Sequence, residues 1–339
     1  MCNESWFRSG GQGRYDVSVK ALLEVRELTV ELPTQAGWVR PVNEVSARIN
    51  AGESLGLVGE SGSGKTMLSL ALMGLLPPGA RVRGEATLAF ESTAIQLTGL
   101  AERDWCDVRG GKIAMIFQEP MTSLNPVLRI GAQIEEAIRA HPPQRNSGEV
   151  KRKAIDALRL AAIPEPEIRA EQFPHQLSGG LRQRAMIAMA LSAGPRLLIA
   201  DEPTTALDVT VQKQILDLLD RLRRELKLGL LFITHDLAVV AEVADRVAVM
   251  YAGRIVEEGP AHEVLAKPRH PYTQGLLKAS PTRKRGALTP IPGTAPQLAA
   301  LPPGCAFEPR CELRREECTA AVPALRVIDP AHAARCILV

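Results

Sequence analysis

A glycine-rich segment, Gly59–Thr66, has the residue types and spacing of a phosphate-binding loop. It reads Gly-Glu-Ser-Gly-Ser-Gly-Lys-Thr, follows the apolar run 54–58 and opens onto a helix-forming stretch. Its glycines let successive backbone N–H groups turn into one concavity that binds anions. We expect Lys65 to reach the β- and γ-phosphates of a nucleotide and Thr66 to bind Mg²⁺. The alternative is a Gly-rich turn that merely precedes a helix, and the strand expected before it argues against that. The residues predicted to hold nucleotide here are Gly59, Ser61, Gly62, Ser63, Gly64, Lys65, Thr66 and Met67.

Two acids, Asp201 and Glu202, directly follow an apolar run that is typical of a buried parallel strand. Open α/β sheets place their chemistry at the carboxyl edge of such strands. We therefore expect Asp201 to lie in the Mg²⁺ shell and Glu202 to polarise an attacking water.

Gln118 and His235 end two further apolar strands that should meet the same sheet edge. An amide both donates and accepts, so Gln118 can ligate Mg²⁺ and order the attacking water. His235 would contact the γ-phosphate. A polar strand cap and a structural histidine are the ordinary alternatives for these two residues.

A second segment that can bind an anion is Ser178-Gly179-Gly180, placed where a helix rich in Ala, Met and Ile begins. Backbone N–H groups at a helix start attract negative charge. Taken without its context, Ser178 would be an ordinary N-cap residue.

Four cysteines, Cys305, Cys311, Cys318 and Cys336, crowd the end of the chain. In a reducing compartment such a cluster indicates a metal site rather than disulfides. Five, six and seventeen residues separate successive cysteines, so no pair has the two-residue spacing of a zinc knuckle. The four thiolates suit either a 4Fe–4S cluster or zinc, which would staple a tail with few apolar residues.

The elements that must position these residues can be read from the apolar pattern. Alternating residues at 22–32 and 38–49 predict an antiparallel β layer over the nucleotide domain. Helical periodicity at about 130–169 predicts an α-helical insertion between core strands. The first twenty residues are Gly- and Ser-rich and predict a flexible extension.

Bulk composition excludes several classes of protein. The 339 residues are 45% hydrophobic, which supports a sizeable core, and a formal charge of +3 does not indicate nucleic-acid binding. Only 4% of residues are aromatic, which disfavours a base-stacking surface. No apolar run is long enough to span a bilayer, and no signal peptide is evident.

Together these motifs resemble the ATPase subunits of ABC transporters, from about residue 22 to residue 259. One departure is Leu181, where the family usually has Gln after Ser-Gly-Gly. The resemblance implies an α/β, P-loop ABC ATPase fold: a RecA-like core (21–259) with an antiparallel β layer and a helical subdomain at about 119–180. The motifs that carry it are Gly59–Thr66, Gln118, Leu177–Gly180, Leu198–Glu202, Ala206–Asp208 and His235.

The same resemblance implies a site shared between two subunits. In this family ATP lies between the P-loop of one subunit and the signature helix of the other, so Ser178, Gly179 and Gly180 would serve the partner's nucleotide. Asp208 would also contact nucleotide, and Trp38 would stack on adenine, although an ordinary hairpin tryptophan is the alternative.

The segment 260–339 resembles the C-terminal extension of ATPase subunits of oligopeptide and dipeptide importers. The resemblance rests on His270–Leu277, Ile291–Pro296 and Leu301–Cys311. Several importers of this kind carry a 4Fe–4S cluster in this segment, which favours iron–sulfur over zinc.

The function implied is ATP hydrolysis that powers peptide import from the cytoplasmic face of the inner membrane. Expected partners are a homologous second ATPase subunit in a heterodimer, two transmembrane permeases and an extracytoplasmic peptide-binding protein. Import of nickel or glutathione by the same machinery is an alternative. A soluble ABC ATPase in DNA repair or translation is less consistent with a single cassette that lacks a coiled-coil insertion.

Overall fold

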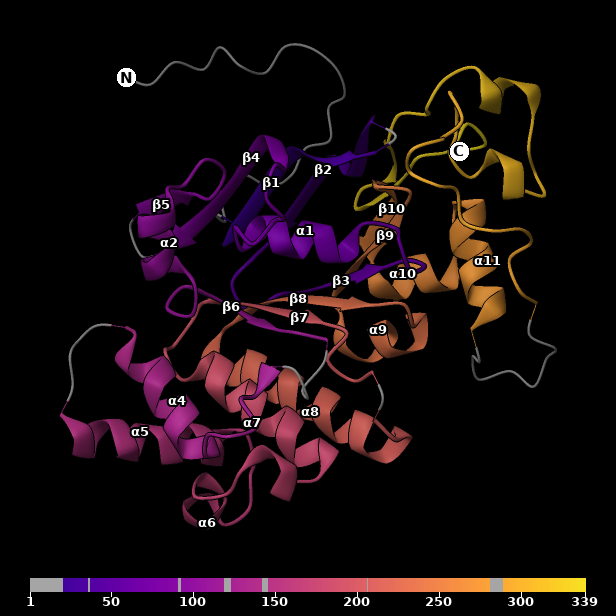
Figure 1. Cartoon of the computed structure of the whole chain (residues 1–339). Helices are drawn as coiled ribbons and strands as arrows, with labels where there is room; N and C mark the ends of the chain where they lie inside the picture. The colour runs from indigo at the N-terminus through magenta and orange to yellow at the C-terminus, as the bar shows by residue number, and fades with distance from the viewer. Residues whose placement is uncertain are drawn as a thin grey trace.

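The computed structural model describes residues 21–35, 37–90, 93–118, 123–141, 146–205, 207–280 and 289–339. Within them the largest sheet has eight strands, and its middle strands run parallel (Figure 1). In their order across the sheet, the strands are β11 (Arg326–Asp329), β12 (His332–Ala334), β10 (Arg254–Pro260), β9 (Arg246–Tyr251), β3 (Ser54–Val58), β8 (Gly229–Thr234), β7 (Leu197–Asp201) and β6 (Ile113–Ile116).

The middle strands are buried on both faces. Every residue of β3, β7 and β8 is buried. Because neighbouring strand residues point to opposite faces, Leu57 packs into one hydrophobic cluster and Val58 into the other. Phe232 and Ile233 divide between the clusters in the same way. Such a sheet needs a covering layer on each face.

A four-stranded antiparallel sheet and two helices cover one face, as the alternating segments predicted. The helix that follows the phosphate-binding loop Gly59–Thr66, called the P-loop below, lies between the two sheets (Figure 1). The elements of this layer are β2 (Gly37–Ile49), β1 (Leu23–Thr34), β4 (Arg81–Phe90) and β5 (Thr93–Gln96), in sheet order, with α1 (Lys65–Leu72) and α2 (Glu102–Val108).

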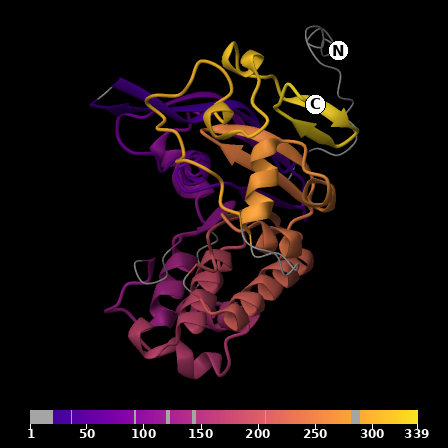
Figure 2. The ribbon, with the colours of Figure 1, turned by 90° about the vertical axis from the view of Figure 1, so that its right-hand side faces the viewer.

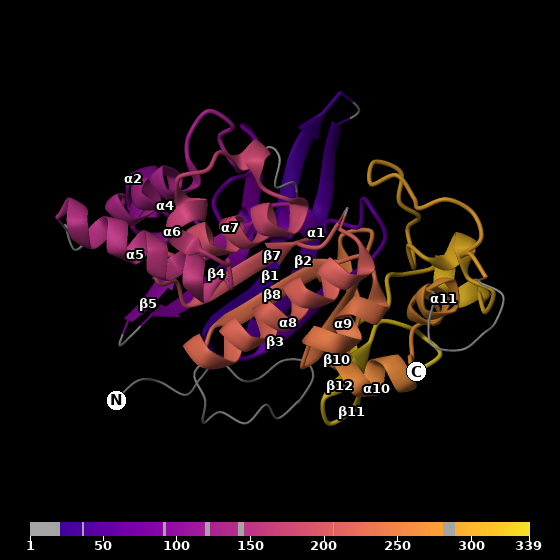
Figure 3. The same cartoon turned by 90° about the horizontal axis from the view of Figure 1, so that it is seen from below.

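Helices cover the opposite face, where α7, α8 and α9 cross the strands (Figure 3). The expected helical insertion is present and gathers at one end of the molecule (Figure 2). The helices of this layer are α4 (Ile130–Arg139), α5 (Ser147–Leu160), α6 (Pro166–Ala170), α7 (Gly179–Leu191), α8 (Val209–Leu226) and α9 (Leu237–Val243).

The C-terminal tail continues the central sheet, which the sequence pattern did not predict. After α10 (Ala261–Ala266) and α11 (Pro271–Ala279), the chain returns through β11 and β12, and β12 pairs with β10. Glu257 of β10 is fully buried and accepts hydrogen bonds from the backbone N–H groups of Arg269 (2.7 Å) and His270 (2.9 Å). His332 of β12 lies 2.7 Å from the same carboxylate. This buried carboxylate ties the tail to the core.

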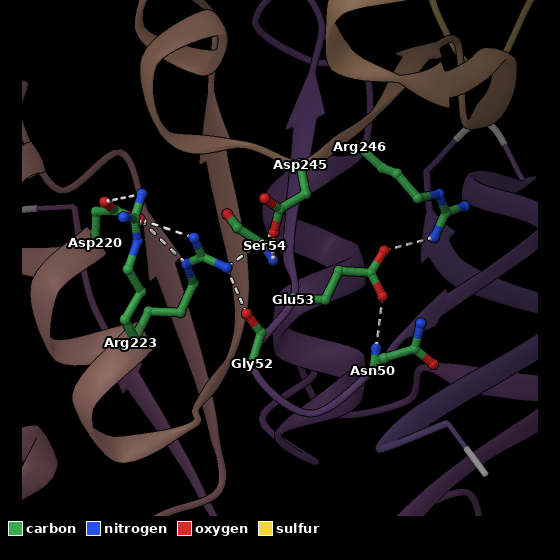
Figure 4. A network of polar contacts seen from close by, with 9 residues as sticks. Asn50, Gly52, Glu53, Ser54, Asp220, Arg223, Asp245 and Arg246 are labelled. Carbon is green, nitrogen blue, oxygen red and sulfur yellow. Dashed lines mark hydrogen bonds and ion pairs between the residues drawn. The ribbon is translucent and has the colours of Figure 1, made fainter. Parts of the chain in front are cut away.

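The start of β3, at the end remote from the P-loop, is fixed by charged side chains (Figure 4). Arg223 of α8 bonds the carbonyl of Gly52 and lies 2.9 Å from Asp245 Oδ2, which accepts the Ser54 N–H at 2.8 Å. Arg246 donates to Glu53 at 3.1 Å. The strand that carries the P-loop is thus anchored at its start.

Some expectations fall outside the described residues: the N-terminal extension 1–20, most of the loop after Gln118, and Ala206. The division of the chain into segments 21–259 and 260–339, with a helical subdomain at about 119–180, stays a prediction.

Candidate functional site

The shape of the P-loop depends on glycines, either because the backbone has a positive φ angle or because no side chain would fit. Gly62 and Gly64 have positive φ angles of 79° and 107°. A Cβ added to Gly64 would lie 1.9 Å from the Pro41 carbonyl oxygen, and one on Gly59 would lie 2.2 Å from that of Met250. Only glycine fits this close approach of backbone to backbone.

Lys65 is folded back onto its own loop. Its Nζ donates to the carbonyl oxygens of Gly59 (2.7 Å) and Glu60 (3.0 Å), and it lies 3.4 Å from Ser63 Oγ. Burial lowers the pKa of Lys65, while the nearby carboxylates of Glu202 and Asp201 push it upward. The charges of both acids therefore act on the lysine that is expected to bind phosphate.

Asp201 has the features of a cation ligand. It is 3% exposed, and its Oδ1 has no hydrogen-bond partner. Burial raises its pKa, and a hydrogen bond from Thr66 opposes that shift. A buried carboxylate oxygen without a partner costs free energy unless something binds it. The pair Asp201–Thr66 fits a Mg²⁺ site beside the P-loop.

Gln118, Glu202 and His235 meet at the carboxyl edge of the sheet, as their positions at strand ends predicted. Glu202 Oε2 accepts from Gln118 Nε2 at 3.3 Å and from the Thr205 hydroxyl at 2.9 Å, and Oε1 lies 3.3 Å from His235 Nδ1. Glu202 has a φ of 48°, a conformation that is costly for a residue with a side chain. Sequence reasoning missed Thr205, which gave no signal of its own.

The Ser178–Gly180 segment begins α7, and it lies across the sheet from α1 (Figure 1). The Ser178 hydroxyl caps the helix by accepting the N–H of Leu181 at 3.4 Å. The donor in this hydrogen bond is a backbone N–H, so the cap does not depend on the side chain at position 181. Asp208 likewise caps α8, accepting from Val211 N–H at 2.9 Å.

Trp38 lies in β2 and is 45% exposed. The guanidinium of Arg81 sits over its ring, 3.9 Å from the centroid. This cation–π contact covers one ring face.

The four tail cysteines line one small cavity. Each sulfur accepts a backbone N–H: Cys318 from Arg315 and Cys336 from Leu338, both at 3.5 Å, and Cys305 and Cys311 from the residues two positions on. Burial raises the pKa of Cys305, Cys311 and Cys336. Within the described ranges, however, no three His, Cys, Asp or Glu side chains are arranged to hold a metal ion, so the structure gives the predicted metal site no direct support.

Two tail residues contact the P-loop, and sequence reasoning missed both. The Arg310 guanidinium forms a paired contact with the Glu60 carboxylate, at 2.7 and 3.0 Å. The Tyr272 hydroxyl accepts the Glu60 backbone N–H at 2.8 Å. The P-loop is therefore held by the segment that carries the cysteines.

Two family models match different parts of this chain. The family described as "ABC transporter" matches residues 42–205, and the one described as "Oligopeptide/dipeptide transporter, C-terminal region" matches residues 256–318. The oligopeptide transport ATP-binding protein OppD of Bacillus subtilis is 51% identical over 86% of this chain and 81% of its own length. The dipeptide transport ATP-binding protein DppD of Escherichia coli is 45% identical over 93% of this chain and 96% of its own.

Solved structures show the same cassette. A dimeric ATP-binding cassette in a post-hydrolysis state, bound to ADP and phosphate, matches 70% of this chain and 98% of its own, with a TM-score of 0.61 at 27% identity. The fold, together with the P-loop and the polar residues at the carboxyl edge of the sheet, thus defines a P-loop ATPase cassette. The chain belongs to the ABC transporter family, within the group of ATP-binding proteins that carry the oligopeptide/dipeptide transporter C-terminal region.

Proposed function

We propose that this chain binds and hydrolyses ATP to power import of di- and oligopeptides across the cytoplasmic membrane. One observation carries the proposal: Gln118, Glu202 and His235 converge beside the P-loop of a chain that matches the peptide-transporter C-terminal region. The names of its relatives, which cite oligopeptide and dipeptide transport, support the substrate class.

The P-loop edge would bind MgATP through residues that already point there. Lys65 would exchange its contacts with the Gly59 and Glu60 carbonyls for phosphate oxygens. Bound Mg²⁺, held by Thr66, Gln118 and Asp201, would neutralise phosphate charge. The P-loop backbone N–H groups and Met67 would complete the cradle, and Trp38 would stack adenine on the ring face that Arg81 leaves free.

The chemical step would depend on Glu202. Its carboxylate would accept a proton from the attacking water, while Gln118 orients that water and His235 contacts the γ-phosphate. Thr205 and Gln118 both donate to Oε2 of this carboxylate, and His235 lies beside Oε1, which supports a fixed orientation. Positioning and charge stabilisation would provide most of the rate.

The site would be completed by a homologous second ATPase subunit in a heterodimer. Ser178, Gly179 and Gly180 would face the partner's nucleotide, since the helix that they begin, α7, lies across the sheet from α1, which follows this chain's own P-loop (Figure 1). Asp208 would also contact nucleotide. The dimeric state of the similar cassette bound to ADP and phosphate supports this arrangement.

We propose that the subunit lies on the cytoplasmic face of the inner membrane, under two permeases that receive peptide from an extracytoplasmic binding protein. In the described part of the chain, none of the helices is long and apolar enough to cross a membrane. We propose that the permeases attach the subunit to the membrane.

The cysteine cavity is proposed to hold a 4Fe–4S cluster, with zinc as the alternative. The residue types support the proposal: four sulfurs line one cavity, and each receives a backbone N–H, which stabilises a thiolate. Bound there, the cluster would cross-link the tail. Protein purified without oxygen should be brown with about four iron atoms per chain; colourless protein with about one zinc would overturn the assignment.

The whole proposal is tested by reconstituting the complex of this chain with its co-purifying subunits in vesicles. ATP-dependent uptake of labelled di- and oligopeptides is the expected result. Uptake of nickel or glutathione but not of peptides would contradict the substrate class. Recovery of the chain with ribosomes or DNA ends, without membrane subunits, would contradict the transport function itself.

A further inference from the structure

Glu60 connects the tail to the lysine that is proposed to bind phosphate. All three of its polar groups are engaged in the structure. Its N–H donates to Tyr272, its carbonyl accepts Lys65 Nζ at 3.0 Å, and its carboxylate pairs with Arg310. A movement of the tail at Arg310 or Tyr272 would therefore be passed through one residue to Lys65.

Arg310 is a fixed partner rather than a mobile surface side chain. Its side chain is 6% exposed, and that of Glu60 is 30% exposed. Nε donates to the Pro292 carbonyl at 2.9 Å, and the rings of Tyr251 and Phe307 lie 6.0 Å from the guanidinium carbon. Two-pronged arginine–carboxylate pairs fix orientation as well as distance. Exposed ion pairs are worth little, but this pair is largely removed from water.

Tyr272 holds the backbone of the same residue. It is fully buried on α11, and its ring packs against those of Tyr251 and Phe307, with centroids 4.4 and 5.4 Å away. Its hydroxyl accepts the Glu60 N–H. A backbone N–H that is removed from water needs such a partner. The side chain and the backbone of Glu60 are thus held by two different parts of the tail.

We propose that Arg310 and Tyr272 are positioning residues for the P-loop, which hold it through Glu60 in the shape that receives phosphate. The docked tail then sets the affinity for ATP. This inference rests on the proposed ATP-binding function and goes beyond it, because it assigns the tail a role in the nucleotide site. A loop that is held in its binding shape loses less freedom when ligand arrives.

The effect should fall on binding rather than on the chemical step. Among the described residues, neither Arg310 nor Tyr272 forms a hydrogen bond or ion pair with Gln118, Glu202 or His235. A contact that acts equally on ground state and transition state changes KM and leaves kcat alone.

The test uses the full-length chain and measures the Kd for MgATP by titration, with KM and kcat measured in the assembled complex. R310A should raise Kd and KM roughly tenfold and change kcat less than twofold. The matched control is R314A, in the same tail, whose side chain is 65% exposed and lies 3.8 Å from Glu308. R314A should leave Kd and KM unchanged.

Two further variants separate positioning from simple loss of folding. R310K keeps the charge without the fork and should recover part of the affinity. Y272F keeps the ring and should raise Kd a few-fold even where R310A does not fold. Hydrogen exchange at residues 59–66 should be faster in R310A and Y272F than in R314A.

The outcomes are distinguishable. Normal affinity in both R310A and Y272F would overturn the inference while leaving the proposed function in place. Equal losses in R310A and R314A would also overturn it, because they would indicate general damage to the tail. An unaltered chain that does not bind ATP would overturn the proposed function, and this inference with it.

Discussion

The two helix starts that can face phosphate, the P-loop and the Ser178–Gly180 segment, differ in how completely the chain itself supports them. Around the P-loop, Lys65 Nζ is bonded to the loop's own carbonyl oxygens, and the N–H, carbonyl and carboxylate of Glu60 all have partners, two of which come from the tail. At the other segment, Ser178 and Gly179 are exposed, and the Ser178 hydroxyl accepts a single cap hydrogen bond at 3.4 Å.

This difference indicates which ligand or partner each segment contacts. A P-loop that is pre-shaped within the chain can bind ATP before a partner arrives. The exposed helix start can bind an anion, and we propose that this anion is the nucleotide of the partner subunit. Variants at the two places should therefore separate binding and hydrolysis by one chain from the contribution of its partner.

The largest effect is expected at Glu202, at the carboxyl edge of the sheet. Glu202→Gln should reduce ATP turnover in the complex roughly a hundred- to ten-thousandfold, because the amide cannot accept the proton. MgATP binding should persist, since Lys65 and Asp201 are untouched. Turnover and Kd measured on the same preparation check this, and undiminished hydrolysis would refute Glu202 as the base.

Acid should weaken the tail contact that supports the P-loop. Burial lowers the pKa of His270 to about 4, against about 6.5 when the chain is unfolded, although the Arg335 backbone opposes the shift. Between pH 6.5 and pH 4 the unfolded chain therefore binds a proton at this histidine that the folded chain does not. The free energy of unfolding falls as the pH drops through that range. The loss can reach about 3 kcal/mol.

The control for this prediction is His270→Asn. His270 Nδ1 accepts the Tyr272 N–H at the start of α11 at 3.0 Å, and asparagine can serve as the same kind of N-cap without titrating. Glu257, which accepts the His270 N–H, is present in both proteins. Urea midpoints at pH 7 and pH 4.5 should differ more for the unaltered chain than for the variant; equal shifts would contradict the assignment.

The anchor at the far end of β3 should matter for stability more than for binding. Arg223 is 8% exposed and bonds Gly52, Asp245 and Asp220 (Figure 4). Arg223→Ala should cost about 2 kcal/mol, since the carboxylates it leaves are partly hydrated. Its neighbour Arg224 pairs with the same Asp220 but is 70% exposed, so Arg224→Ala should cost less than about 0.5 kcal/mol. Thermal melts of both variants check the difference.

Local sequence predicted the P-loop edge well because its signals are contiguous. A glycine pattern beside a strand fixes Gly59–Thr66, and strands that end in polar residues must meet at one edge. This is why Gln118, Glu202 and His235 were expected together and lie together. The family resemblance then added the fold, which the solved cassettes confirm.

The tail contacts could not be predicted because they join residues far apart. Arg310 and Glu60 are 250 positions apart, and neither stands in a motif that requires the other. β11 and β12 have only four and three residues, too few to show alternation. Arg81 over Trp38 was missed for the same reason, since side-chain stacking leaves no period in the sequence.

The smallest effect, at the exposed helix start, is the most direct test of the comparison. Ser178→Ala removes the hydroxyl that caps α7 and that would face the partner's nucleotide. Turnover in the complex should fall about tenfold, as expected for loss of one hydrogen bond to a charged group. The Kd for MgATP of this chain alone should not change. Asn146→Ala is the matched control, because Asn146 caps α5 in the same way, accepting Glu149 N–H at 2.9 Å. Both variants lose about 1 kcal/mol of cap energy. If turnover falls equally in both variants, the loss of helix stability explains the effect. The proposal that Ser178 faces a partner's nucleotide would then be wrong.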